Sequence, residues 1–278
     1  MRILIVTPHA GTIATGNRCS AEQWRRLLEG VGHEVELAPS YDGQSAEVLV
    51  ALNAERSHSS IAAFRGKKIV VLTGTDIYPE PGSSARDSMR RADCLVALQS
   101  KAVEQVPAEF RSKVRVIVQA AEPPAEKAES DAKHFDIAVV AHLRAVKDPL
   151  RAAAAVRLLP ESSKVRVRHV GAVLEPEFES LAQREMAENS RYQWLGEVEP
   201  AQAARLIANS DLLAITSHSE GAGRVVGEAV VAGTPVLSTR IDGVVGLLGE
   251  DYPGFFPVGN AAALAELIAR AEGETGFL

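Results

Sequence analysis

The sequence predicts an α/β protein made of two Rossmann-like, doubly wound domains that face a common cleft. Short runs rich in Val, Ile and Leu alternate with helical patterns along most of the 278 residues, which is typical of a parallel sheet covered by helices. The alternation breaks once, at 119–134, where the chain is rich in Pro, Ala and charge and has no apolar face. It then restarts. We therefore predict domains at 1–118 and 135–278, joined by a linker at 119–134.

In the first domain the apolar run 2–8 is too short for the core of a signal peptide, and it leads directly into a glycine-containing loop. It therefore predicts a first strand. The further predicted strands of this domain are 33–38, 67–76, 93–100 and 113–120. The predicted helices are 20–32, a short one near 44–53, 83–92 and another short one after 100.

The second domain repeats the pattern. Its predicted strands are 135–144, 164–171, 192–197, 211–217 and 234–239. Its predicted helices are 149–159, 176–189, 199–210 and 224–233. Sheets of this kind bind ligands at the carboxyl ends of their strands, so the sequence places the site in the cleft between the domains.

The composition excludes several classes of protein. With 46% hydrophobic and 24% charged residues the chain is typical of a folded globular protein. A net charge of −6 argues against nucleic-acid binding, and no apolar stretch is long enough to predict stable membrane insertion. The two cysteines, Cys19 and Cys94, form no disulfide framework, which fits a reducing, cytoplasmic setting.

The segment Ala214–Arg240, "AITSHSEGAGRVVGEAVVAGTPVLSTR", carries the most chemistry. A strand ending at Ser217 leads through a glycine-rich turn to a helix that starts near Arg224. Backbone N–H groups at such a helix start suit a phosphate or diphosphate. Glu228 lies eight positions after Glu220 and is surrounded by valines in the sequence. A carboxylate buried among such residues needs hydrogen-bond or charge partners. It could form an i, i+4 pair with Arg224, or it could accept hydrogen bonds from vicinal hydroxyls.

The stretch "SEGAGRVVGEAVVAGTPV" resembles the Glu-x7-Glu signature of family-4 type glycosyltransferases, which have the GT-B fold. The resemblance implies that Glu220 contacts the donor sugar and Glu228 the nucleotide ribose. It places four residues near the donor diphosphate: Gly221, Ala222, Gly223 and Arg224. It also places the nucleotide base near Leu195 and Gly196.

A second match lies in "VVAHLRAVKDP", where the family usually has Gly-Arg-Leu followed by a lysine. Lys147 falls on the family lysine, while His142 occupies the arginine position and Arg144 follows two residues later. Two cations there would neutralise the departing nucleoside diphosphate. Because the sequence has no Asp-x-Asp, we expect a metal-independent reaction that needs no cofactor, the UDP-sugar being a substrate.

Four longer stretches together resemble the selenosugar synthases of selenoneine biosynthesis: "TPHAGTIATGNRCSAEQWRRLLEGVGHEV", "TGTDIY", "HLRAVKDP" and "IDGVVGLLGEDYPGFFPVGNAAAL". This resemblance implies transfer of a sugar, typically N-acetylglucosamine, from a UDP-sugar to selenophosphate with formation of a C–Se bond. The sequence departs from the wider family at Gly246, near a position where a glutamate is common. It also ends at "RAEGETGFL", with little room for the helix that usually crosses back to the first domain.

On the acceptor side, the resemblance directs attention to Gly16, Asn17 and Arg18 at the start of the first helix. Gly16 would also help to enclose the donor diphosphate, and Arg18 would be the counter-charge of the acceptor anion. In "TGTDIY", Thr73 and Thr75 could bind the acceptor. Asp76 could hold a sugar hydroxyl, orient Arg18 or act as a base, or it could cap the following turn. The candidate catalytic set is Arg18, Asp76, Arg144, Lys147 and Glu220.

Three rival functions remain open from the sequence. A conventional glycosyltransferase would use a sugar or lipid hydroxyl as acceptor, and Asp76 would then be the first choice of base. A non-catalytic protein that binds nucleotide sugars would share the same motif. An NADP-dependent oxidoreductase is suggested by "GAGRVVG" and by "STR" after the next strand, but the glycine spacing is G-x-G-x-x-x-G and lies in the second domain.

Overall fold

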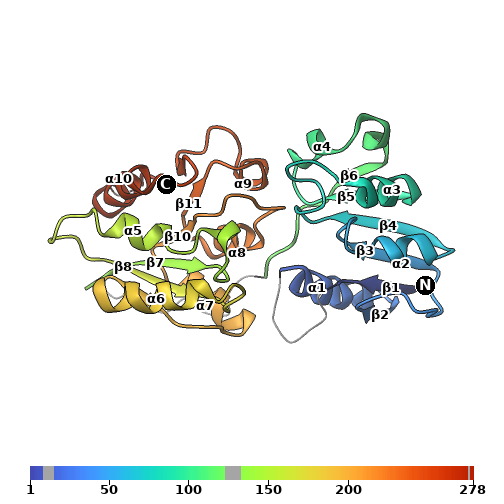
Figure 1. Cartoon of the computed structure of the whole chain (residues 1–278), viewed down its shortest axis with the longest axis horizontal. Helices are drawn as coiled ribbons and strands as arrows, with labels where there is room; N and C mark the ends of the chain where they lie inside the picture. The colour runs from blue at the N-terminus through green and yellow to red at the C-terminus, as the bar shows by residue number, and fades with distance from the viewer. Residues whose placement is uncertain (9–15, 123–132, 275) are drawn as a thin grey trace. The chain divides into compact units, whose positions relative to one another are not determined.

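The computed structural model describes residues 1–8, 16–122, 133–274 and 276–278. These residues form two compact units, one of Met1–Gln119 with Glu220–Ala222 (unit 1) and one of Ala120–Ser219 with Gly223–Leu278 (unit 2). Each unit contains a six-stranded parallel sheet with helices packed on it (Figure 1). The two-domain α/β architecture predicted from the sequence is therefore confirmed. Most of the predicted linker, 123–132, lies outside the described residues.

The sheet of unit 1 has the order β2-β1-β3-β4-β5-β6, with all neighbours parallel. Its strands are β1 (Arg2–Val6), β2 (Glu34–Ala38), β3 (Val48–Leu52), β4 (Lys67–Leu72), β5 (Cys94–Ala97) and β6 (Val114–Val116). Because β1 lies between β2 and β3, the direction of winding reverses there. The carboxyl ends of β1 and β3 thus form the switch point at which open α/β sheets bind ligands.

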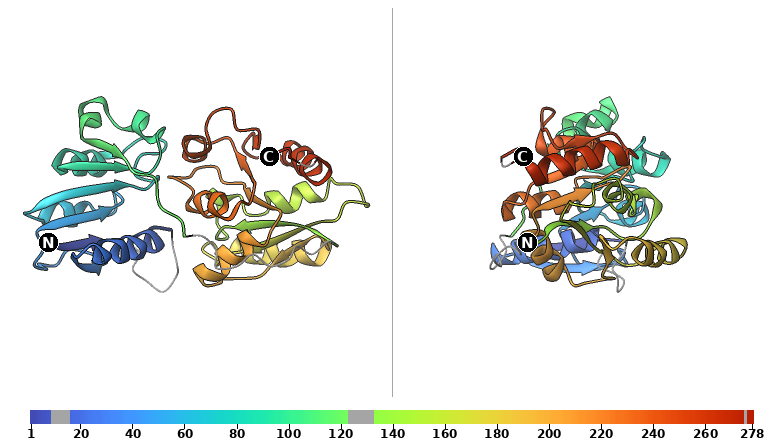
Figure 2. Two further views of the ribbon diagram at one scale, coloured as in Figure 1. Left: turned by 180° about the vertical axis from the view of Figure 1, so that it is seen from behind. Right: turned by 90° about the vertical axis from the view of Figure 1, so that its left-hand side faces the viewer.

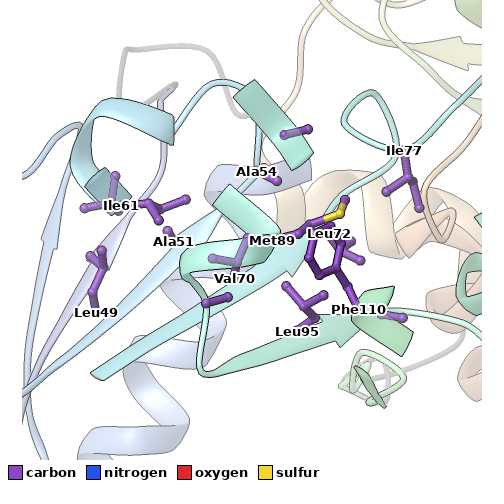
Figure 3. Packing of buried hydrophobic residues seen from close by; sticks show 14 of the residues in the cluster. Leu49, Ala51, Ala54, Ile61, Val70, Leu72, Ile77, Met89, Leu95 and Phe110 are labelled. Carbon is purple, nitrogen blue, oxygen red and sulfur yellow. The ribbon is translucent and has the colours of Figure 1, made fainter. Parts of the chain in front are cut away.

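The helices of unit 1 cover the two faces of this sheet. They are α1 (Gly16–Gly30), α2 (His58–Ala63), α3 (Ser83–Arg91), α4 (Ala102–Gln105) and the 3-10 turn η1 (Ala108–Lys113). α1 packs against β1 and β2, as the view from behind in Figure 2 also shows. Beneath α2 and α3 lies one buried apolar core, in which Ile61, Met89 and Phe110 meet residues of the central strands such as Leu72 and Leu95 (Figure 3).

The short helix predicted near 44–53 is wrong: these residues contain β3, which pairs with β1 on one side and β4 on the other. All but the first of its five residues, "VLVAL", are buried. A short continuous apolar run has no periodicity that separates a buried strand from a buried helix, so tertiary pairing decides its conformation. The helix of this region, α2, begins later, at His58.

The sheet of unit 2 has the order β12-β11-β10-β7-β8-β9 and is also parallel throughout. Its strands are β7 (Phe135–Val140), β8 (Val165–Val170), β9 (Tyr192–Trp194), β10 (Leu212–Ile215), β11 (Val236–Thr239) and β12 (Phe255–Phe256). Its helices are α5 (Arg151–Val156), α6 (Glu177–Glu188), α7 (Pro200–Ala208), α8 (Arg224–Ala232), α9 (Asp242–Leu248) and α10 (Ala261–Gly273), with the 3-10 turn η2 (Ala145–Lys147).

Side chains of the two central strands of unit 2, β7 and β10, alternate between two buried cores. Ile137 and Val139 of β7 join the core beneath α5 and α10, while Ala138 between them joins the core beneath α7 and α8. This alternation is the consequence of a strand whose successive side chains point to opposite faces of a sheet covered on both sides. It explains why a central strand such as β10, "LLAI", reads as a continuous apolar run in the sequence.

Candidate functional site

The switch point of unit 2 lies at β7, because the strands that follow it in the chain, β8 and β10, pair with it on opposite sides. The loops that leave the carboxyl ends of β7 and β10 therefore start next to one another. The first loop carries Arg144 and Lys147, and the second leads to the start of α8 at Arg224. Two stretches that the sequence singled out separately are thus brought to one sheet edge.

Hydrogen bonds fasten the η2 turn to the end of β10. The hydroxyl of Thr216 donates to the carbonyl oxygens of Lys147 and Asp148, at 3.0 and 2.9 Å. The backbone N–H of His218 donates to the carbonyl of Val146 at 2.8 Å. Thr216 is buried, so these bonds are shielded from water. The backbone that carries Lys147 is consequently held in place by the neighbouring strand.

Arg144 begins this turn with a guanidinium that is incompletely paired. Its Nε atom is buried and has no hydrogen-bond partner in the described part of the chain. A buried donor without an acceptor is unfavourable by about 1–3 kcal/mol, and such groups are rare in folded proteins. A bound anion would supply the missing acceptor.

A buried histidine fixes the backbone at Ala141, three residues before Arg144. His169, on β8, is fully buried; its Nε2 lies 2.8 Å from the carbonyl oxygen of Ala141, and its Nδ1 lies 2.8 Å from the hydroxyl of Tyr192. Burial lowers the pKa of His169 to about 4. The ring is therefore neutral near pH 7, with Nε2–H donating to Ala141 and Nδ1 accepting from Tyr192. The next residue, His142, accepts a hydrogen bond from the backbone N–H of Ala172 at 3.1 Å.

The start of α8 is shaped by Gly223, which has a φ of 41° and precedes the first helical residue. A side chain there would be strained by the left-handed backbone and would press on Val226. Nε of Arg224, the first residue of α8, donates to Oε1 of Glu228, one turn further along the helix, at 2.8 Å. The two side chains are 24% and 15% exposed. The i, i+4 pair considered from the sequence is therefore present, while Nη1 of Arg224 is buried without a partner among the described residues.

The remaining donor-side predictions fall in two places. Leu195 and Gly196 follow β9; Leu195 is exposed, and the carbonyl of Gly196 accepts a hydrogen bond from the N–H of Gly171 at 2.8 Å. Glu220, Gly221 and Ala222 are grouped with unit 1. Of these, Ala222 is buried and Glu220 is half-buried. Contact of these residues with a nucleotide sugar stays a prediction.

Unit 1 brings together several of the predicted acceptor residues. The amide of Asn53 donates from Nδ2 to the hydroxyl oxygens of Thr73 and Thr75, at 3.0 and 2.9 Å. Nδ2 of Asn17, in the first turn of α1, lies 3.5 Å from the Thr73 hydroxyl. Gly16 is the exposed first residue of α1 and Arg18 is half-buried, while the loop 9–15 before them lies outside the described residues.

Asn53 was missed by the sequence analysis. It follows β3, the strand that was mistaken for a helix, and it has a positive φ of 72°, a conformation that Asn adopts more readily than most residues. A single Asn directly after an apolar strand was the available signal. Its network could not be read from the sequence, because its partners lie about twenty positions away.

The carboxylate of Asp76 is anchored by the backbone of unit 1. It is buried and accepts three backbone N–H bonds, from Ala54 at 2.8 Å, Thr73 at 2.9 Å and Gly74 at 2.8 Å. Burial raises its pKa, and these hydrogen bonds oppose that shift. The arrangement matches the turn-capping alternative, and it ties the end of β3 to the end of β4.

The comparisons with known proteins identify the family. A family model described as glycosyl transferases group 1 matches residues 122–275, more than half of the chain. This chain belongs to that family. Over 78 residues this chain is 35% identical to D-inositol 3-phosphate glycosyltransferase of Segniliparus rotundus. That alignment covers 26% of this chain and 17% of the relative.

Solved glycosyltransferase structures share the fold over nearly the whole chain. Anabaena Alr3699/HepE, solved with UDP and glucose, matches with a TM-score of 0.77 and 20% identity over 100% of this chain and 91% of its own. WaaG, a glycosyltransferase involved in lipopolysaccharide biosynthesis, matches with a TM-score of 0.73 and 16% identity over 100% and 92%. The GT-B fold predicted from the sequence is thus confirmed. None of the described helices has the length and apolar character needed to span a bilayer.

Proposed function

We propose that this protein is a glycosyltransferase that takes its sugar from a UDP-sugar bound at the switch point of unit 2. Membership in the glycosyl transferases group 1 family supports the reaction class. The proposal for the site is carried by two buried guanidinium atoms that have no hydrogen-bond partner among the residues the structure describes, Nε of Arg144 and Nη1 of Arg224. Both belong to loops or helix starts that leave the same edge of the sheet, and a diphosphate would satisfy them.

In this proposal each donor-side residue has a stated task. Arg144 and Lys147 neutralise the charge that develops on the leaving diphosphate, and the backbone N–H groups at the start of α8 bind its oxygens. Glu228 is oriented by its bond to Arg224 and accepts hydrogen bonds from the ribose hydroxyls. Glu220 contacts the donor sugar, and the backbone around Leu195 and Gly196 contacts the base.

For the acceptor we propose selenophosphate, bound by Asn17, Arg18, Thr73 and Thr75 of unit 1. The selenium lone pair attacks C1 of the sugar, the bond from C1 to the β-phosphate oxygen breaks, and UDP leaves with the bonding electrons. The products are UDP and a selenium-linked glycosyl phosphate, from which hydrolysis of the Se–P bond releases phosphate and the selenosugar. N-acetylglucosamine is the proposed sugar.

The contacts of Asp76 favour this acceptor over a sugar or lipid hydroxyl. An alcohol must lose a proton as it attacks, and Asp76 is the base that the sequence offers. The carboxylate of Asp76 already accepts three backbone N–H groups and is shielded from solvent. An acceptor that is already an anion needs no base, so it suits this environment better.

The test is a transfer assay with UDP-N-acetylglucosamine and enzymatically generated selenophosphate, read by mass spectrometry. The proposal predicts that UDP and a product with the selenium isotope pattern form together, and that Lys147→Met slows both. UDP release with a sugar or lipid acceptor, and none with selenophosphate, would reject the selenium acceptor and leave the reaction class standing. Tight binding of NADPH with no binding of UDP would reject both.

A further inference from the structure

The end of β4 in unit 1 carries two hydroxyl groups whose direction is set by a neighbour. Nδ2 of Asn53 is 3.0 Å from Oγ1 of Thr73 and 2.9 Å from Oγ1 of Thr75. Both amide hydrogens of Asn53 are used in these bonds. The side-chain amide of Asn53 cannot be flipped, because its Oδ1 accepts the backbone N–H of Arg56 at 2.9 Å.

A hydroxyl oxygen that accepts a hydrogen bond still has its own hydrogen to donate. Within the described residues neither Thr73 nor Thr75 donates its hydroxyl hydrogen to any group of the protein. Asn17 adds a second, longer donor contact to the Thr73 oxygen, at 3.5 Å. Asn53 therefore leaves both hydroxyls with a hydrogen to offer to a ligand.

A third hydroxyl, that of Thr7, is buried at the same sheet edge. Thr7 follows β1 directly and is fully buried, and its Oγ1 has no hydrogen-bond partner among the described residues. β1 pairs with β3, with Val6 opposite Ala51, so Thr7 lies beside the segment that leads into Asn53. This is the switch point of unit 1, where a ligand is expected on topological grounds.

From this arrangement we propose that Asn53 is a positioning residue. By orienting the threonine hydroxyls, it makes the switch point of unit 1 a site that offers only hydrogen-bond donors to a phosphate-like oxyanion. A neutral sugar hydroxyl presents both a donor and an acceptor, whereas a phosphate presents acceptor oxygens that match a set of donors. The proposal rests on the proposed function only for the source of the oxyanion, which is either the acceptor or the diphosphate of the donor.

The test uses the full chain, inorganic phosphate as the probe and Asn53→Asp as the main variant. Aspartate keeps the shape, tolerates the positive φ and still accepts the N–H of Arg56. Its second oxygen, however, accepts hydrogen bonds, so it draws both threonine hydroxyl hydrogens inward. Asn260→Asp is the matched control, because it makes the same change of charge at the N-cap of α10, where Asn260 accepts the N–H of Ala263. Thr75→Val and Thr75→Ser form a second pair, one without and one with the hydroxyl.

In the wild type, titration with phosphate is expected to shift the backbone amide signals of Thr73–Thr75 in NMR spectra. We expect about tenfold to a hundredfold weaker phosphate binding in Asn53→Asp, corresponding to the loss of charge-assisted hydrogen bonds. Thr75→Val should weaken binding in the same direction, and Asn260→Asp and Thr75→Ser should bind like the wild type. No phosphate response in the wild type, or full affinity in both Asn53→Asp and Thr75→Val, would overturn the proposal.

A parallel UDP titration separates the two sources of the oxyanion. If Asn53→Asp weakens phosphate and UDP binding together, the site holds the donor diphosphate. If it weakens phosphate alone, the site holds the acceptor. Both results support a site that offers only hydrogen-bond donors. Absence of UDP binding to the wild type would instead reject the proposed function while the phosphate result stands by itself.

Discussion

The buried imidazole of His169 makes the stability of unit 2 decrease at acidic pH. The folded chain keeps this ring neutral until its pKa of about 4, whereas an exposed histidine of the unfolded chain binds a proton near pH 6.5. Between these values the unfolded state binds more protons, so stability rises with pH across the window. The stabilising contribution is complete above pH 6.5 and is lost as the pH falls towards 4. A separation of about 2.5 pH units corresponds to about 3 kcal/mol.

The matched perturbation is His169→Gln. A glutamine offers an N–H to Ala141 and an oxygen to Tyr192, so it imitates the neutral ring but does not titrate. Urea unfolding would be followed at several pH values by tryptophan fluorescence in a Trp24→Phe background. In that background Trp194, whose Nε1 donates to the carbonyl of Gly171, is the remaining tryptophan and reports on unit 2.

The predicted quantity is the difference in unfolding free energy between the two proteins. At pH 7 the wild type is expected to be the more stable. That advantage should shrink by about 3 kcal/mol as the pH falls from 7 to 4. Only in the wild type does unfolding expose a histidine at this position, and the exposed ring then binds a proton that favours the unfolded state. An advantage that stays constant or grows on acidification would refute the neutral, buried assignment of His169.

Three further outcomes follow from the described contacts. Gly171→Ala should destabilise unit 2 by about 3 kcal/mol in the same urea experiment, because the added Cβ overlaps with the carbonyl of Ala141; wild-type stability would contradict the close approach. Asp76→Ala should destabilise unit 1 by about 3–5 kcal/mol, since it leaves three backbone N–H groups without an acceptor. A mild effect on stability together with a large loss of turnover would show that Asp76 acts chemically instead. Glu228→Gln should weaken UDP binding about tenfold in calorimetry, compared with Glu266→Gln on α10; unchanged binding would remove the ribose assignment.

The alternation of strands and helices was readable from the sequence because each unit buries both faces of its sheet. The run 135–144 predicted the strand β7 correctly, since burial on both faces leaves this strand apolar except at Asp136. The same property hid β3: "VLVAL" carries no periodic signal, and its strand character comes from pairing with β1 and β4. The conformation of a short buried run is decided by the strands that it pairs with, and a single sequence does not show which strands these are.

The candidate site was predictable to the extent that its contacts are local. The pair of Arg224 and Glu228 is four residues apart on one helix, so spacing alone allowed it to be considered. The networks around Asn53 and His169 link residues about twenty or more positions apart, and they depend on which strands are adjacent. Asp76 shows the same limit, because its choice between a base and a turn cap depends on the distant backbone N–H of Ala54.

The central claim is that the switch point of unit 2 binds UDP, and a UDP titration of the wild type, Arg144→Gln and Arg205→Gln tests it most directly. Arg205 is an exposed arginine in the last turn of α7 and serves as the charge-matched control. We predict that UDP shifts backbone amide signals in 142–148 and at the start of α8, and that Arg144→Gln binds about tenfold more weakly while Arg205→Gln binds normally. Absence of UDP binding, or equal binding by all three proteins with shifts confined to unit 1, would contradict the account.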